Sequence, residues 1–292
     1  MGRQRLWISV IMLGGLAIGG GYAGARLGMP ETLAQPARQH ETAYDRIMRT
    51  RVIRCGYFVW PPFLVKDANT GALSGFSHDF MAALGAALDV KIEWTQELGF
   101  ASYLQDLASG RYDMECTGGW PNAKRGQLAF FSKPYAFMPS VAVARANDAR
   151  FDKSLDAINA PTVTVATIDG EASAMIRDSR FPATKQASLP DIASPSDLIL
   201  NVVTGKADVT FLDLVSVRQY DARYPGKIKI LGLDHPVHLI ALSATLPQDE
   251  RLKQMIDTAT DQLLNSGQID NLLNAYEKGG RMFLRADQTF RE

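Results

Sequence analysis

The regular alternation of short apolar segments with amphipathic segments constrains the fold of this chain more than any other feature. The segments 51–55 and 208–212 are short and largely apolar, which is typical of buried strands. Between such strands, apolar residues recur at helical spacing, as at Phe80, Leu84 and Leu88. Strands that alternate with helices form mostly parallel sheets from right-handed βαβ units, so the sequence predicts an α/β fold.

The alternating pattern falls into two halves, and the residues after the second half look like a return to the first. We therefore expect one lobe from 48–143 plus 242–280, a second lobe from 148–235, and a carboxyl-terminal tail at 281–292. Ligands of such sheets bind at the carboxyl ends of the strands. The loops that directly follow predicted strands are thus the candidate binding loops.

The amino terminus has the features of an export signal. Arg3 and Arg5 precede an uncharged run that ends in an Ala-x-Ala sequence at Ala25. This predicts a cleaved signal peptide at 1–25 and a leader or linker at 26–47. The alternative is an uncleaved anchor, because the run is about long enough to span a bilayer once. Either form places the working protein in the periplasm, free or tethered.

Charge and motif content exclude several classes of protein. Lys plus Arg and Asp plus Glu number 31 each, whereas a nucleic-acid-binding protein needs a basic excess. His235 and His238 lie beside Asp234, but they lack the usual ligand set of a metal site and are more typical of a solvated loop. GxSxG and P-loop motifs are absent from the sequence, and the one GxGxxG pattern, at 19–24, falls inside the predicted signal peptide. We therefore expect a binding protein without metal or cofactor rather than an enzyme.

Two post-strand loops of the first half carry binding chemistry. Tyr57 and Trp60 follow the first strand, where aromatic rings can stack on a ligand or cover a cation. Gly118 follows a later strand, and a glycine there exposes backbone amides to an anion. Arg125 lies just beyond it and can clamp a carboxylate with two hydrogen bonds. A plain turn with a surface arginine is the alternative for this loop.

The second half offers carboxylates in the same kind of position. Glu171 opens a predicted helix, where it either faces a ligand or complements the helix dipole. Asp213 ends a predicted strand, where it either holds an ammonium group or caps the following helix. A cationic clamp in one half and carboxylates in the other would suit a zwitterion held between lobes.

Several short motifs in order make the chain resemble the family 3 extracellular solute-binding proteins, which are amino-acid receptors of ABC importers, over about residues 45–278. The resemblance implies a two-lobed type II periplasmic-binding-protein fold, with a hinge of two crossover segments near 141–147 and 236–245. The motifs are Trp-Pro-Pro-Phe at 60–63, Gly-Phe-Ser-His-Asp at 75–79, Ser-Gly-Arg-Tyr-Asp at 109–113, Asn-Ala-Lys-Arg at 122–125, Phe-Ser-Lys-Pro-Tyr at 131–135, Gly-Lys-Ala-Asp at 205–208 and Asn-Ser-Gly-Gln-Ile at 265–269.

The resemblance also implies roles for single residues. Arg125 would grip the ligand α-carboxylate, Asp213 would take the α-amino group, Trp60 would stack on the ligand, and Gly118 would contribute a backbone amide. Arg125→Ala is accordingly predicted to abolish binding while leaving the fold intact.

Three residues depart from the family pattern. Trp120 replaces a usual Ser or Thr, Glu171 replaces a small hydroxyl residue, and Tyr57 stands where an acidic residue is common. Their rings and added negative charge suit a more cationic ligand.

The resemblance implies that the protein is a monomer that captures a small amino-acid-like solute by clamshell closure and delivers it to an ABC permease in the inner membrane. The main alternative is an enzyme similar to the cyclohexadienyl or arogenate dehydratases, which share this fold and use a glutamate near the position of Glu171. A ligand-sensing module is a further alternative.

Cys55 and Cys116 fall in strands that we expect to be neighbours. Adjacent strands can direct side chains to opposite faces, so the sequence does not decide whether the two cysteines form a disulfide.

Overall fold

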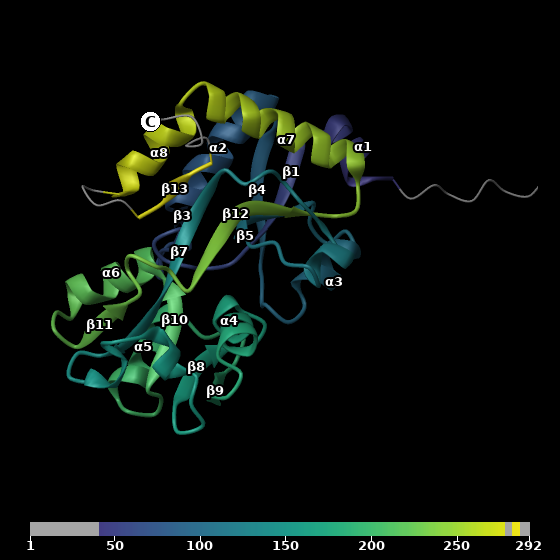
Figure 1. Cartoon of the computed structure of the whole chain (residues 1–292). Helices are drawn as coiled ribbons and strands as arrows, with labels where there is room; N and C mark the ends of the chain where they lie inside the picture. The colour runs from purple at the N-terminus through teal and green to yellow at the C-terminus, as the bar shows by residue number, and fades with distance from the viewer. Residues whose placement is uncertain (1–40, 278–281, 287–292) are drawn as a thin grey trace, which may run out of the picture. The chain divides into compact units, whose positions relative to one another are not determined.

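The computed structural model describes residues 41–277 and 282–286, so the predicted signal peptide at 1–25 lies outside the described residues. In the described part, helices and strands alternate as predicted (Figure 1). Over those same residues, we find no helix that combines the length and the apolar character needed to cross a bilayer.

The first lobe is built on a parallel sheet in which β1 (Val52–Tyr57) lies between β4 (Lys91–Glu97) and β5 (Met114–Gly119). Helices from both ends of the chain cover this sheet (Figure 1). The helical segments of this lobe are α1 (Ala43–Thr50), α2 (Phe76–Leu88), α3 (Tyr103–Ala108), η1 (Arg125–Gln127), α7 (Glu250–Asn265) and α8 (Gln268–Glu277). Its short strands are β2 (Val65–Lys66), β3 (Leu73–Ser74) and β6 (Phe130–Phe131).

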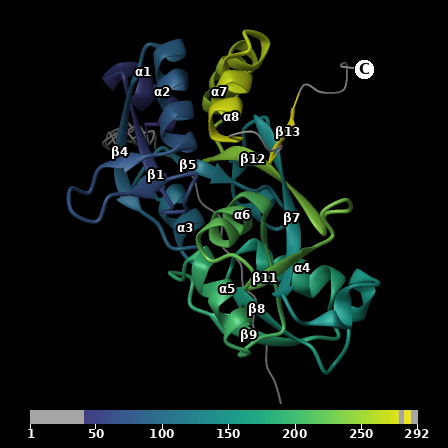
Figure 2. The same ribbon diagram turned by 90° about the vertical axis from the view of Figure 1, so that its left-hand side faces the viewer.

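The second lobe repeats this plan with β8 (Thr164–Ile168) between β10 (Val209–Asp213) and β9 (Lys185–Leu189), again in parallel. In Figure 2 its helices gather around these strands, away from α7 and α8. The remaining elements are η2 (Ala149–Phe151), η3 (Leu155–Ile158), α4 (Ala172–Arg180), α5 (Pro195–Val203), α6 (Leu214–Arg223) and β11 (Ile228–Leu231).

Two long antiparallel strands join the lobes. β7 (Ala136–Arg145) and β12 (His238–Leu246) pair with each other, as at Ile240 and Met138. β7 also pairs with β10 and β11 of the second lobe, whereas β12 pairs with β5 and β6 of the first. The predicted fold, two mostly parallel sheets joined by a two-strand hinge, is therefore confirmed.

Three elements differ from the sequence-based expectation. α1 begins at Ala43, inside the expected leader at 26–47, where Thr42 caps the helix and Ile47 is fully buried. β13 (Leu284–Arg285) lies in the expected tail and pairs with β7. β9 was missed because this half-exposed strand lacks apolar alternation.

Local signals and burial position the elements around the hinge. Ser194 and Asp197 form a reciprocal capping box at the start of α5, with Pro195 in the first turn. Apolar side chains from both lobes form one large buried cluster that includes Ala142 of β7 and Leu242 of β12. A second cluster lies between α5, α6 and the sheet of the second lobe. The crossover strands are thus part of the core rather than a loose tether.

Candidate functional site

A cavity lies where the strands of both lobes end. Its volume is about 50 Å³. The ends of β5 and β10 and the loops after β1 and β8 all contribute to its wall. Six of the residues singled out from the sequence line this cavity: Trp60, Gly118, Trp120, Arg125, Glu171 and Asp213.

Tyr57 is the exception, because it does not line the cavity. Its ring is buried and makes an edge contact with Trp94, with ring centroids 5.8 Å apart. Successive side chains of a strand point to opposite faces, and it is the next residue, Phe58, that faces the cavity. Tyr57 therefore lies at the predicted strand end but outside this cavity.

Asp213 and Trp60 meet across the two lobes. The Trp60 indole Nε1 donates to Asp213 Oδ2 at 3.2 Å. Asp213 is the N-cap of α6, and its Oδ1 accepts from the Ser216 amide at 2.7 Å. Burial raises the pKa of this carboxyl, although the hydrogen bonds from Ser216 and Trp60 oppose the rise. Asp213 is therefore both a helix cap and a buried acid at the cavity.

Glu171 is likewise both a cap and a cavity residue. It is the N-cap of α4, where its Oε2 accepts from the Ser173 amide at 2.7 Å and also from the Ser173 hydroxyl. Burial raises its pKa to about 7, the bonds from Ser173 and Ala172 oppose that rise, and the nearby Asp213 adds to it. The sequence left a choice between helix cap and ligand-facing acid, and the structure combines the two.

Arg125 extends from the first lobe to the second. Its guanidinium lies over the Trp120 ring, 3.6 Å from the ring centroid. Nη2 donates to the Gly170 carbonyl of the second lobe at 2.7 Å, and Nη1 donates to the Trp120 carbonyl at 3.3 Å. Burial lowers the pKa of this group, with Tyr103 and Glu171 acting against the decrease. Arg125 thus connects the lobes through backbone carbonyls.

Further contacts hold the lobes together beside the cavity. The Ser216 hydroxyl donates to the Pro61 carbonyl at 3.3 Å, and the Ala101 amide donates to Asp191 at 3.3 Å. Gly170 lies against Phe100 of the first lobe with a φ of +75°, a conformation that favours glycine. The lobes are therefore in a closed arrangement.

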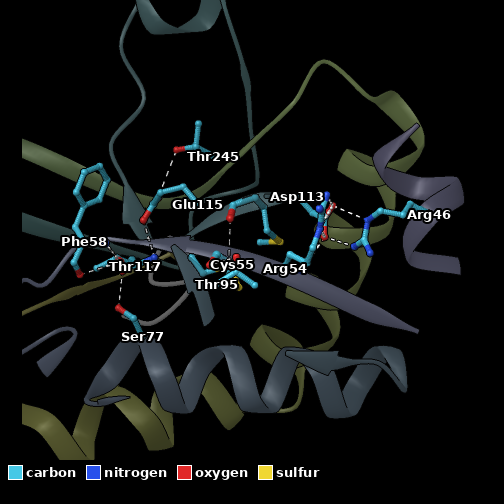
Figure 3. Close-up of a disulfide and its surroundings, with 12 residues drawn as sticks. Arg46, Arg54, Cys55, Phe58, Ser77, Thr95, Asp113, Glu115, Thr117 and Thr245 are labelled. Carbon is cyan, nitrogen blue, oxygen red and sulfur yellow. Dashed lines mark hydrogen bonds and ion pairs between the residues drawn. A yellow bond between two sulfur atoms is a disulfide. The ribbon is translucent and has the colours of Figure 1, made fainter. Parts of the chain in front are cut away.

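Glu115 in β5 is a polar residue near the site that the sequence reasoning missed. It is fully buried, and its Oε1 accepts from the Thr117 amide at 2.6 Å (Figure 3). The amides of Gly118 and Gly119 also hydrogen-bond to this carboxyl. Burial raises its pKa to about 7 against these bonds. An acidic residue inside an otherwise apolar strand was the available signal.

Two aromatic residues of the wall were also missed. Phe100 and Tyr103 follow β4, and both line the cavity. Phe100 stacks on Phe58 with ring centroids 4.3 Å apart and meets Trp60 edge-on at 5.9 Å. The strand-end rule would have found Phe100, which lies in the loop after β4, whereas Tyr103 is the first residue of α3.

A disulfide joins Cys55 of β1 to Cys116 of β5, with the Cα atoms 5.6 Å apart (Figure 3). The two strands pair in parallel, with Cys55 opposite Met114. The question left open by the sequence is therefore answered by strand register, which brings the two side chains to one face. The bridge lies next to Glu115 and Thr117, directly behind the loop that contains Gly118.

Comparisons with known proteins agree with this architecture. Residues 53–279 match the sequence pattern of the bacterial extracellular solute-binding proteins, family 3. The chain is similar to the cyclohexadienyl dehydratase of Pseudomonas aeruginosa, with 23% identity over 218 residues that cover 74% of this chain and 79% of the relative.

Two solved structures share the fold. One is the ancestral amino acid-binding protein AncCDT-1, a precursor of cyclohexadienyl dehydratase, with a TM-score of 0.70, 24% identity, and coverage of 80% of this chain and 99% of that chain. The other is a binding component of an ABC transporter from Wolinella succinogenes complexed with lysine, with a TM-score of 0.69, 20% identity, and coverage of 82% and 98%. At such identities the likeness shows the fold alone.

Proposed function

Because this chain belongs to the bacterial extracellular solute-binding proteins, family 3, we propose that it captures a small, amine-bearing solute of the amino-acid type between its lobes. The observation that carries the proposal is a single cavity to which Arg125 contributes from one lobe and Glu171 and Asp213 from the other. A ligand that touches both sets of groups favours the closed arrangement, because only that arrangement offers all the contacts.

The charge and the walls of the cavity favour a cationic group on the ligand. Two buried carboxyl groups, Glu171 and Asp213, face a single guanidinium. Aromatic rings such as Trp60 and Phe100 make up much of the remaining wall, and ring faces attract cations. The lysine complex of the Wolinella succinogenes protein supports this proposal.

The proposal extends to location and partner. The family is extracellular, and the first 25 residues have the pattern of an export signal, so the protein would work in the periplasm. It would act as a monomer and present its closed form to an ABC permease of the inner membrane. The similar ABC transporter component from Wolinella succinogenes supports this role.

Calorimetric titration with lysine, arginine and their decarboxylated amines tests the proposed function. At least one of these ligands is expected to bind, and Asp213→Asn should weaken its binding at least about tenfold. Asparagine is as good an N-cap as aspartate, so the change removes the charge and keeps the helix start. Asp249→Asn at the N-cap of α7 is the matched control away from the cavity and should leave affinity unchanged. Failure of all four ligands to bind, or a neutral Asp213→Asn, would contradict the proposal.

A dehydratase activity is the second candidate, and Glu171 is the reason. A buried carboxyl with a pKa of about 7 is suited to general-acid chemistry near neutral pH. The similarity to the Pseudomonas aeruginosa dehydratase points in the same direction. Incubation with prephenate or arogenate distinguishes the two functions. Turnover to an aromatic product would establish the enzyme activity, and unchanged substrate would favour the binding function.

A further inference from the structure

The backbone amides that could hold a ligand carboxylate in the first lobe are already occupied. Gly118 has a φ of +112°, and a Cβ atom there would lie 2.5 Å from the Tyr135 hydroxyl, so the loop conformation requires glycine. In this conformation the amides of Thr117, Gly118 and Gly119 hydrogen-bond to Glu115 of the same chain. The group that these amides bind is therefore a buried carboxyl of the protein itself.

The start of α4 in the second lobe is occupied in the same way. A helix N-terminus offers free amides and a positive dipole end to an anion. Here Glu171 accepts from the Ser173 amide and from the Ser173 hydroxyl. An incoming carboxylate would have to displace this buried carboxyl or share the amides with it. Both arrangements bring two negative charges together, which is unfavourable away from water.

The guanidinium of Arg125 is also engaged. One face lies over the Trp120 ring, and the two hydrogen bonds of its terminal nitrogens go to the carbonyls of Gly170 and Trp120. A bidentate grip on a carboxylate needs two parallel N–H groups directed at the ligand. These two bonds use one N–H of each terminal nitrogen, so a grip on a carboxylate would have to use the Nε–H and the second N–H groups of those nitrogens.

The remaining cavity wall suits a cation with an apolar stem. Glu171 and Asp213 supply negative charge, and Asp213 holds the Trp60 indole in place through Nε1. Phe58, Phe100 and Phe211 provide apolar ring surface.

We propose that the ligand is an organic cation without a carboxylate, an alkylamine or alkylguanidine, because this chain fills each of its own carboxylate-binding positions from within. The inference rests on the proposed function and names its ligand class more narrowly. It assigns Glu115 and Glu171 as specificity-determining residues: Glu115 occupies the loop amides, and Glu171 occupies the helix start.

Matched pairs of ligands test this inference. Agmatine differs from arginine, and cadaverine from lysine, only by loss of the carboxylate. In calorimetric titration of the full mature chain, the decarboxylated member should bind at least about tenfold tighter in at least one pair. Equal or tighter binding of arginine and lysine would overturn the inference while upholding the proposed function. Absence of binding for all four ligands would remove both.

A variant of Glu171 tests whether this internal carboxylate is what selects against ligands that carry a carboxylate. Glu171→Ser removes the internal carboxylate and keeps a side chain that caps helices well. The ratio of arginine to agmatine dissociation constants should then fall at least about tenfold. Asp178→Asn, an exposed acid on the same helix with a 63% exposed side chain, is the control and should leave the ratio unchanged. An unchanged ratio in Glu171→Ser would overturn the role of the internal carboxylate.

Discussion

The two lobes use the same framework and differ in what reinforces it. Each has a Gly-basic-x-Asp sequence before its inner strand, ending in Asp113 before β5 and in Asp208 before β10. Asp113 accepts from the Arg54 amide at 2.6 Å, and Asp208 accepts from the Thr164 amide at 2.9 Å. Two arginines then surround each aspartate: Arg46 and Arg54 in the first lobe, Arg145 and Arg150 in the second.

The equivalent positions beyond these aspartates differ in chemistry. Cys55 and Cys116 of the first lobe correspond by register to Val165 and Phe211 of the second, both of which are buried. Glu115 corresponds to Thr210, whose hydroxyl donates to a backbone carbonyl. The first lobe is thus covalently braced behind its binding loop, whereas the second lobe relies on apolar packing. The same strand framework can therefore be stabilised either by a disulfide or by apolar packing.

Removal of the disulfide, which is present only in the first lobe, should cause the largest loss of stability. The bridge closes a loop with a sequence separation of 61, so its loss should cost about 4 kcal/mol of unfolding free energy. Urea unfolding of the Cys55→Ala/Cys116→Ala variant measures this cost. Reductant should destabilise the natural chain and leave the variant unaffected. Two free thiols in denatured, unreduced protein would show that the bridge does not form.

The second-largest effect on the free energy of unfolding is expected from substitution of Asp113 and Asp208, and the two costs should differ. Asp113 is 1% exposed, so Asp113→Asn leaves two arginines facing a buried neutral group and should cost about 3 kcal/mol. The Asp208 side chain is 20% exposed and its arginines are partly solvated, so Asp208→Asn should cost about 1 kcal/mol. Chemical denaturation of both variants checks the order. Equal costs would show that burial does not distinguish the two ion-pair clusters.

The smallest effect on stability is expected from substitution of Glu115, which has no acidic counterpart in the second lobe. Its pKa is raised to about 7, above the unfolded value, so the folded state holds its proton more tightly between those values and stability falls as pH rises. Glu115→Gln should flatten this slope by about 1 kcal/mol between about pH 5.5 and 6.5.

The slope contributed by Glu171 should persist in that variant, because its pKa is also raised to about 7. Denaturation curves across this pH range measure the slope. Glu250→Gln, at an exposed position on α7, is the control and should not change it. A slope in Glu115→Gln identical to that of the natural chain would mean that Glu115 is ionised throughout.

Much of the fold was predictable because it depends on local pattern. The helix with Phe80 and Leu84 and the strand ending at Asp213 follow from apolar spacing alone. β9 was missed because it is mostly exposed and is held by its pairing with β8, and α1 was missed because only Ile47 of that helix is buried. For the site, the strand-end rule pointed to six residues that line the cavity and to Tyr57, which contacts Trp94 instead.

Local patterns were enough to predict most strands and helices, the two-lobed fold and the loops that end at the cavity, since neighbouring residues carry these signals. Only the tertiary structure decided that Cys55 meets Cys116 and that Glu115 faces the amides of its own loop. It also decided that Arg125 reaches the Gly170 carbonyl of the other lobe. These outcomes depend on strand register and on the approach of segments far apart in the chain, which no local pattern encodes.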